Sequence, residues 1–386
     1  MNRRQLGNLF FSLSVGMSGI IYTGLYTLAD RITLELGWSP DAIGFLVSLY
    51  SAGSFSSMLI SGIWADRLGK RRMVRIALCA ATLGCLLLVL GGNALVILPG
   101  VYLLAMGASC GEIQSSAILT ERNAGNAARW MNISQMFFCL GAIGAPVAAV
   151  WLSTNSPLGY RSIFLILTVL AAAMFLVAKM QSRPSPKPES TVPLSLNLFH
   201  ILSKTPFLLI CLMLFLYAGY ETLSVAFLKP YATRLGLSET AAAATISVFW
   251  AFMIIGRFIG VFLGRQEARG IAAFGVVFLA GTAITLLART PLLLFVGAAL
   301  LGFGCGPVWP LLIVLGSRQN PNKNGTSFAV MSLFSSGGGI VFPSLLGLLP
   351  ASDSLAFLLC AALAAILLIL LGVSKRQVTA DELQAG

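Results

Sequence analysis

The chain has 386 residues, of which 57% are hydrophobic and only 10% are charged, and its mean hydropathy is +0.89. Soluble domains usually carry about 25% charged residues, so this composition excludes an ordinary soluble protein and indicates a polytopic helical membrane protein. The net charge of +12 needs no nucleic-acid partner, because membrane proteins concentrate Lys and Arg in their cytoplasmic loops.

Long apolar stretches recur along the whole chain. A membrane-spanning helix needs roughly 20 apolar residues, and about twelve stretches meet this length. In chain order, they are Leu9–Ala29, Ala42–Ile63, Val74–Leu90, Leu95–Leu119, Met131–Leu152, Ile163–Met180, Phe207–Leu228, Ala241–Leu263, Ala272–Leu287, Leu292–Leu315, Phe328–Leu349 and Leu355–Val373. The first stretch lacks a small-residue cleavage site near its end, so we interpret it as a retained helix.

The distribution of cations predicts the orientation. With the amino terminus in the cytoplasm and an even number of spans, 19 of the 25 Lys and Arg residues lie on the cytoplasmic side, 5 lie outside and Arg257 falls inside a span. Cytoplasmic loops are the ones that carry excess positive charge. We therefore expect a multi-pass protein of the cell (inner) membrane with both termini in the cytoplasm.

A polar, proline-rich segment interrupts the apolar rhythm at residues 181–205. Its composition is typical of a flexible linker. The sequence therefore predicts an all-α protein with a six-helix bundle over residues 1–180, a cytoplasmic linker, and a second six-helix bundle over residues 206–386 that ends in a short tail. Two such halves with a site between them at the membrane midplane are typical of secondary transporters.

Motifs for enzymatic chemistry are missing. The single histidine, His200, lies in the linker, and no Cys-x-x-Cys or Gly-x-x-x-x-Gly-Lys-Ser/Thr pattern occurs. Metal sites, a histidine-based triad and ATP hydrolysis need such residues. We therefore expect no cofactor, no metal, no catalytic residues and no enzyme, and a membrane enzyme or receptor is a disfavoured alternative.

A charged motif separates the second and third apolar stretches. The segment from Gly62 to Arg72 reads Gly-Ile-Trp-Ala-Asp-Arg-Leu-Gly-Lys-Arg-Arg, and such polar residues favour a tight loop at the membrane surface. The pattern G-x-x-x-D-R-x-G-x-R-R resembles the loop between helices two and three of the major facilitator superfamily. That resemblance implies solute transport, and it implies gating roles for Asp66, Arg67 and Arg71.

Only three ionisable side chains fall deep within predicted spans, namely Glu112, Glu221 and Arg257. Burying one costs about 2.5–3.5 kcal/mol on insertion scales, so such residues usually mark ion or substrate pathways. We expect Glu112 and Glu221 to couple proton movement to transport and Arg257 to take part in gating. A buried ion pair that only joins helices is the structural alternative.

Amide and aromatic side chains provide candidate contacts for a polar solute. Asn132 and Gln135 are three residues apart, and Tyr22 and Tyr26 are four apart, so each pair lies on one helical face. Amides can bind hydroxylated solutes through hydrogen bonds, whereas interfacial belts and core packing are the alternative for the aromatic residues. The predicted substrate-binding residues are Tyr22, Tyr26, Glu112, Gln114, Asn132, Gln135, Tyr217, Tyr220, Trp250 and Trp309.

Glycine and proline recur inside the spans, as in Gly302-Phe-Gly-Cys-Gly-Pro307 and Gly337-Gly-Gly339. Small residues allow helices to approach closely, which is our preferred interpretation. Bending points for alternating access are the alternative.

Several spans also resemble the fucose–proton symporter family. The likeness lies in Cys110-Gly-Glu112, in Asn132-Ile-Ser-Gln135 ahead of Leu140-Gly-Ala-Ile, in Gly256-Arg-Phe-Ile-Gly260 and in Gly306-Pro-Val-Trp-Pro310. The resemblance implies that Glu112 binds substrate or couples protons and that Asn132 and Gln135 face the substrate. Family members carry a carboxylate within helix one, whereas the nearest here, Asp30, falls at the outer end of the first span.

These observations favour a proton-coupled symporter for a small, sugar-like polar solute. A proton-driven exporter of drugs or metabolites is the alternative, because Gly141…Gly144-Ala-Pro146 partly copies a helix-five motif of drug antiporters. The fourth span lacks the arginine usual in those antiporters. The expected partners are the solute, protons and membrane lipid, and we expect a monomer.

Overall fold

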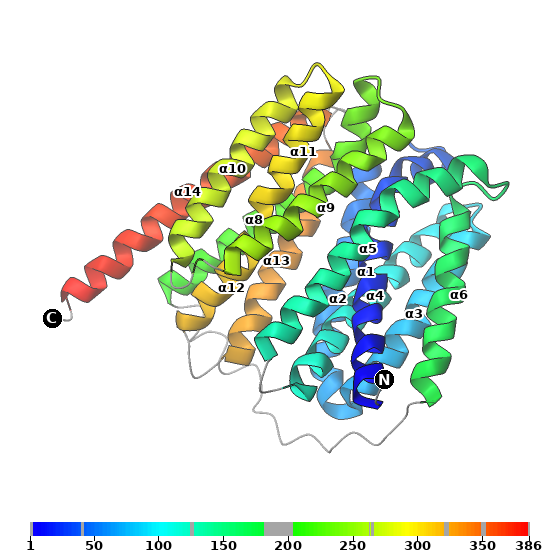
Figure 1. Cartoon of the computed structure of the whole chain (residues 1–386), viewed down its shortest axis with the longest axis horizontal. Helices are drawn as coiled ribbons and strands as arrows, with labels where there is room; N and C mark the ends of the chain where they lie inside the picture. Colours follow the sequence, from blue (N-terminus) through cyan, green and yellow to red (C-terminus); the bar gives the residue numbers. More distant parts are fainter. Residues whose placement is uncertain are drawn as a thin grey trace. The chain divides into compact units, whose positions relative to one another are not determined.

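The computed structural model describes residues 3–39, 42–123, 127–180, 204–261, 263, 266–319, 324–348 and 353–384, which form helices joined by short connections (Figure 1). The helices are α1 Arg3–Glu35, α2 Ile43–Leu68, α3 Lys70–Leu90, α4 Ala94–Arg122, α5 Ala127–Asn155, α6 Arg161–Met180, α8 Thr205–Arg234, α9 Glu239–Val261, α10 Glu267–Leu287, α11 Pro291–Cys305, α12 Val308–Gln319, α13 Asn324–Gly347 and α14 Asp353–Gln384.

Within the described ranges, twelve helical segments are long and apolar enough to cross a membrane, which confirms the predicted all-α architecture. Most helices extend beyond the predicted apolar stretches. The first span was expected to end at Ala29, but α1 continues to Glu35. Asp30 therefore lies inside a helix instead of at its end.

The chain separates into two compact units. The first comprises Met1–Thr191 with Ser238–Ser247, and the second comprises Val192–Leu237 with Val248–Gly386. Within the first unit, Glu239 at the start of α9 forms an ion pair with Arg31 of α1. The predicted linker and His200 lie outside the described residues, apart from positions 204 and 205.

Each unit has its own packing scheme. In the first unit, α1 packs against α5 and α4, while α3 packs against α4 and α6. In the second, α8 packs against α13 and α14, and α10 packs against α11 and α14. Figure 1 shows α6 beside α3 in the first unit.

Glycines sit where helices approach most closely. A Cβ atom on Gly302 would collide with the carbonyl oxygen of Phe249, and one on Gly338 would collide with that of Phe215. In the first unit, a Cβ atom on Gly141 of α5 would likewise collide with the carbonyl oxygen of Gly16 in α1. The predicted packing role is confirmed at these positions, since any side chain would push the helices apart.

The junction between α2 and α3 is shorter than expected. The charged motif was predicted to form a loop, but α2 continues to Leu68 and α3 begins at Lys70. Gly69 alone changes direction, with φ of 83°, a conformation that glycine adopts without steric cost. Its amide donates to the carbonyl oxygen of Ala65 at 2.9 Å. Asp66 and Arg67 are therefore helical residues at the end of α2.

A second break divides one membrane span. The segment Pro291–Gly316 is a single candidate span, yet α11 ends at Cys305 and α12 begins at Val308. Pro307 has no amide hydrogen and cannot continue the hydrogen-bond ladder of α11. The break leaves the backbone oxygens of Cys305 and Gly306 available to side chains.

Candidate functional site

The first unit brings two predicted residues together through a hydrogen bond. Glu112 lies in α4 and Gln135 in α5, and Gln135 Nε2 donates to Glu112 Oε1 at 3.3 Å. Both side chains are partly exposed. An amide that holds a carboxylate leaves its own oxygen able to accept a further hydrogen bond, so the pair can contact a hydroxylated solute.

Aromatic rings lie near this pair. Tyr22 and Tyr26 of α1 contact each other with ring centroids 4.4 Å apart, and Tyr50 of α2 lies 5.7 Å from Tyr22 and 5.5 Å from Tyr26. Tyr50 is also close enough to Glu112 for the two to interact electrostatically. The predicted tyrosine pair is thus one part of a trio.

Tyr50 and Phe138 were missed in the sequence. Phe138 of α5 lies 6.1 Å from Tyr22 between ring centroids, and it is one helical turn beyond Gln135. The signal for Tyr50 was a tyrosine in the middle of the second span, in Ser48-Leu-Tyr-Ser51. No pattern within α2 linked it to α1, because that contact arises only when the helices pack.

Two other predicted residues do not join this group. Gln114 is two residues beyond Glu112, which turns it about 200° around α4 and onto the opposite face. It is 4% exposed, and its Oε1 atom has no hydrogen-bond partner. Asn132 lies in α5, but its side chain is outside the described residues.

The second unit contains a different carboxylate cluster. Glu221 of α8 interacts electrostatically with Arg257 of α9 and through a hydrogen bond with Tyr217. Arg257 Nε also donates to the carbonyl oxygen of Gly306 at 3.3 Å, and the Tyr217 hydroxyl lies 3.2 Å from the carbonyl oxygen of Cys305. The broken end of α11 therefore holds both partners of Glu221.

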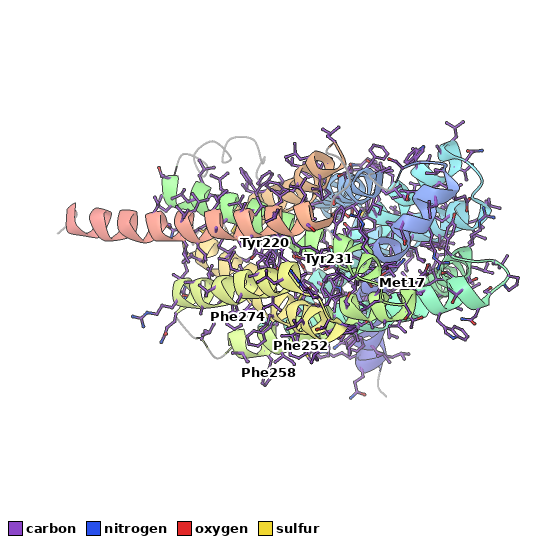
Figure 2. All side chains as sticks on the ribbon, turned by 90° about the horizontal axis from the view of Figure 1, so that it is seen from above. Met17, Tyr220, Tyr231, Phe252, Phe258 and Phe274 are labelled. Atoms are coloured by element: carbon purple, nitrogen blue, oxygen red, sulfur yellow. The ribbon has the colours of Figure 1, made fainter. Side chains whose placement is uncertain are left out.

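The aromatic residues of the second unit are mostly enclosed. Tyr217 is 0% exposed, and Tyr220 and Trp250 are each 1% exposed. Tyr220 packs on Phe278 of α10 with ring centroids 4.3 Å apart. Figure 2 shows Tyr220 among the helices of this unit, whereas Phe258 lies at its edge. These rings act as packing groups in this structure.

Trp309 and the predicted gating residues at the α2–α3 junction lie outside the two carboxylate clusters described above. Trp309 is a partly exposed residue of α12. The side chains of Asp66 and Arg67 lie outside the described residues. Beside them, Lys70 forms an ion pair with Glu121 at the end of α4, and Arg71 lies near Arg122. The charged motif thus connects α3 to the end of α4.

Metal-binding residues do not gather in the part of the chain that the structure describes. There, no group of three or more His, Cys, Asp and Glu side chains is placed to hold a metal ion.

The whole chain is similar to known membrane transporters. Residues 9–343 match the family model of the Major Facilitator Superfamily. An MFS-type transporter of Yersinia pestis is 25% identical over 96% of this chain and 94% of its own length. The multidrug resistance protein MdtL of Escherichia coli is 22% identical over 64% of this chain and 70% of its own length.

Solved structures share the same fold. The Escherichia coli fucose:proton symporter FucP has a TM-score of 0.64 and 20% identity, with 96% of this chain and 97% of that chain covered. The nucleoside transporter NupG has a TM-score of 0.76 and 14% identity, with 95% and 99% covered. The family model spans most of the chain, and the fold agrees with it. This membrane protein therefore belongs to the Major Facilitator Superfamily and is a transporter, not an enzyme.

Proposed function

We propose that this transporter moves a small, sugar-like polar solute across the cell membrane together with protons. The observation that carries the proposal is the Gln135–Glu112 hydrogen bond of 3.3 Å at a carboxylate placed within the membrane span Ala94–Leu119. Ionisable groups at such depth usually mark ion or substrate pathways. The named substrate of FucP, fucose with a proton, supports the solute class.

The chemistry of the first-unit cluster suits a polyhydroxylated molecule. Carboxylate and amide groups offer acceptors and donors to hydroxyl groups, and the tyrosine rings of Tyr22, Tyr26 and Tyr50 offer apolar faces with polar tips. In the proposal, Glu112 contacts the solute and takes up a proton during each cycle. Asn132 contributes a second amide from α5.

The second-unit cluster has a supporting role in this proposal. Glu221 and Arg257 change their pairing during transport, and Arg257 then keeps the Gly306 carbonyl oxygen, to which its Nε already donates, as a partner. Tyr217, Tyr220 and Trp250 become accessible to the solute only when the second unit rearranges, whereas Trp309, already partly exposed, can contact it beforehand. The junction formed by Asp66, Arg67 and Arg71 acts as a cytoplasmic gate.

The cation distribution supports the proposed orientation in the membrane. The protein acts as a monomer with both termini in the cytoplasm, and its six-helix halves, residues 1–180 and 206–386, alternate access to the solute. A proton-driven exporter of drugs or metabolites is the second candidate, favoured by the similarity to MdtL.

Solute identification comes first in the test. A thermal-shift screen of the purified protein over sugars, nucleosides, amino acids and common drugs should give a sugar-like hit, because a ligand at 100 times its Kd stabilises the folded state by about 2.7 kcal/mol. The hit is then offered to proteoliposomes with an imposed pH gradient. Accumulation driven by inward proton flow supports the proposal, whereas extrusion in exchange for inward protons would establish the second candidate instead.

A further inference from the structure

A cavity of about 380 Å³ lies in the first unit, away from the Glu112 cluster. It is formed where α1 begins, α4 ends and α5 begins. The α5 residues that line it are Trp130, Ile133 and Phe137, one face of that helix. Gln135 is turned about 200° from Ile133, onto the other face. The cavity is thus separate from the proposed transport site.

One wall of the cavity is polar and has an unused hydrogen-bond acceptor. Asn8 is 5% exposed, and its Nδ2 atom donates to Asn123 Oδ1 at 3.4 Å. Its Oδ1 atom is buried without a partner. A buried polar atom that lacks a hydrogen bond costs about 1–3 kcal/mol, so a ligand that donates a hydroxyl hydrogen there would recover that free energy.

Positive charge gathers at the same end of the unit. Arg4 lines the cavity and hydrogen-bonds the Arg122 carbonyl oxygen, while Arg122 donates to the Arg4 carbonyl oxygen at 3.2 Å. Burial first, and then repulsion from Arg71 and Arg4, lowers the pKa of Arg122. Among the described residues, none of these three arginines forms an ion pair with a carboxylate. This positive charge favours an anionic ligand at this end of the unit.

Gly7 lets Arg122 take this position. A Cβ atom on Gly7 would lie 2.7 Å from Arg122 Nη1, so the guanidinium rests directly on the α1 backbone. The same group lies over the Phe11 ring, 5.9 Å from its centroid. Contacts with Gly7 and Phe11 therefore fix the Arg122 guanidinium in one place near the cavity.

The other wall is apolar and continues along the helix. Leu9 lines the cavity with Ile133 and Phe137. Leu6, Leu9 and Leu13 follow one another along α1 at 52%, 37% and 49% exposure. Exposed leucines on a spanning helix form an apolar surface, so this stripe offers an acyl chain a path along α1 from its charged end. A soluble phosphate would need no such apolar path.

From these features we infer that the cavity binds the headgroup of an anionic phospholipid that carries hydroxyl groups. The lipid phosphate lies against Arg4, which lines the cavity, while Arg122 adds positive charge beside it. A headgroup hydroxyl donates to Asn8 Oδ1, and an acyl chain follows Leu9, Ile133 and Phe137. Charge-assisted hydrogen bonds from arginine are the strongest contacts available to a phosphate.

Native mass spectrometry of the full-length protein in a neutral detergent tests the contact between the arginines and the lipid phosphate. The probes are phosphatidylglycerol and, as a lipid without net charge, phosphatidylcholine. Removing one cation near a lipid phosphate should weaken binding about fivefold, so Arg4→Gln should lose that much affinity for phosphatidylglycerol. Arg72→Gln, the same change at an exposed residue of α3, should alter it less than about twofold. Equal losses in both variants would mean general surface charge and would overturn the inference.

The hydroxyl contact is tested separately. Wild-type protein should bind phosphatidylglycerol more tightly than phosphatidylethanol, which carries the same charge but no headgroup hydroxyl. Asn8→Leu should remove that preference. An unchanged preference would contradict the role of Asn8, and displacement of the lipid by free glycerol 3-phosphate at an equal concentration would identify a soluble ligand instead.

A third variant covers the case in which Arg4→Gln does not fold. Ile133→Trp fills the cavity from its apolar side and leaves every cation in place. It should remain monodisperse and lose phosphatidylglycerol binding to the level of phosphatidylcholine. Wild-type binding in this folded variant would overturn the inference.

Discussion

Among the described residues, each unit has a carboxylate far from the ends of a candidate span, Glu112 in the first and Glu221 in the second, and the two are held differently. Glu112 accepts a hydrogen bond from a neutral amide, that of Gln135, and lies near Tyr50, whose ring contacts Tyr22 and Tyr26. Glu221 faces the guanidinium of Arg257 and the hydroxyl of Tyr217. The first arrangement offers groups to a solute, whereas the second satisfies its own charge inside the protein.

This difference separates two roles, binding a solute and joining helices, that the sequence did not distinguish. A carboxylate held by an amide and lined by aromatic rings can exchange its partner for a solute. A carboxylate held by an arginine at a broken helix end fixes α8, α9 and α11 together. We therefore expect changes at Glu112 to alter transport without a large loss of stability, and changes at Glu221 to lower stability in addition to any effect on transport.

The largest effect should come from breaking the second-unit pair. Arg257→Gln leaves the Glu221 carboxylate without its cation and should lower the free energy of unfolding by about 2–3 kcal/mol, less than for a fully buried pair because both side chains keep some exposed surface. Chemical or thermal unfolding in detergent measures this. The exposed Arg269 offers a control, and Arg269→Gln should change stability by less than about 0.5 kcal/mol.

The double variant Glu221→Gln/Arg257→Gln sharpens this prediction. It removes both charges, so much of the lost stability should return. If the single and double variants lost the same stability, the pair would not hold the second unit together, and the contrast with Glu112 would fail.

A smaller effect is expected at the amide of the first unit. Gln135→Leu removes the donor to Glu112 and should weaken solute affinity about tenfold, the cost of one hydrogen bond to a charged group. Gln114→Leu is the matched control, because the same substitution falls on the opposite face of α4. Equal losses of affinity in both variants would show that Gln114 contacts the solute after all. Titration of solute-induced thermal stabilisation measures both.

The smallest effect should come from the tyrosine trio. Tyr50→Phe keeps the ring and removes the hydroxyl near Glu112, so solute affinity should fall about two- to fivefold. Tyr102→Phe removes a hydroxyl that donates to Ser56 at 2.6 Å, and this change should leave solute affinity as in the wild type. An unchanged affinity in Tyr50→Phe would remove Tyr50 from the site.

The sequence predicted the helices well because spanning segments obey a simple length and hydrophobicity rule. The twelve spans follow from local composition. The glycine-rich segments indicated close packing in the same way, although not which helices would meet there. The end of α1 was wrong by six residues, since Asp30 and Arg31 lowered the apolar character of a segment that remains helical.

The site was predictable only in part. Glu112 and Gln135 stood out because polar residues inside spans are rare, and the structure brings them together. Tyr50 and the pairing of Glu221 with Arg257 depend on which helices are neighbours, and nothing within a single span encodes that. Gln114 was misleading because it is close to Glu112 in sequence but on the opposite face of the helix.

Proton coupling at Glu112 is most directly tested by comparing accumulation with exchange in proteoliposomes that contain Glu112→Gln. With an inward gradient of about 2 pH units, a wild-type symporter that moves one proton per solute can concentrate the solute up to about 100-fold. The variant cannot release a proton from this position, so it should show no accumulation while still exchanging labelled for unlabelled solute. Wild-type accumulation in Glu112→Gln would contradict the assignment of proton coupling to this residue.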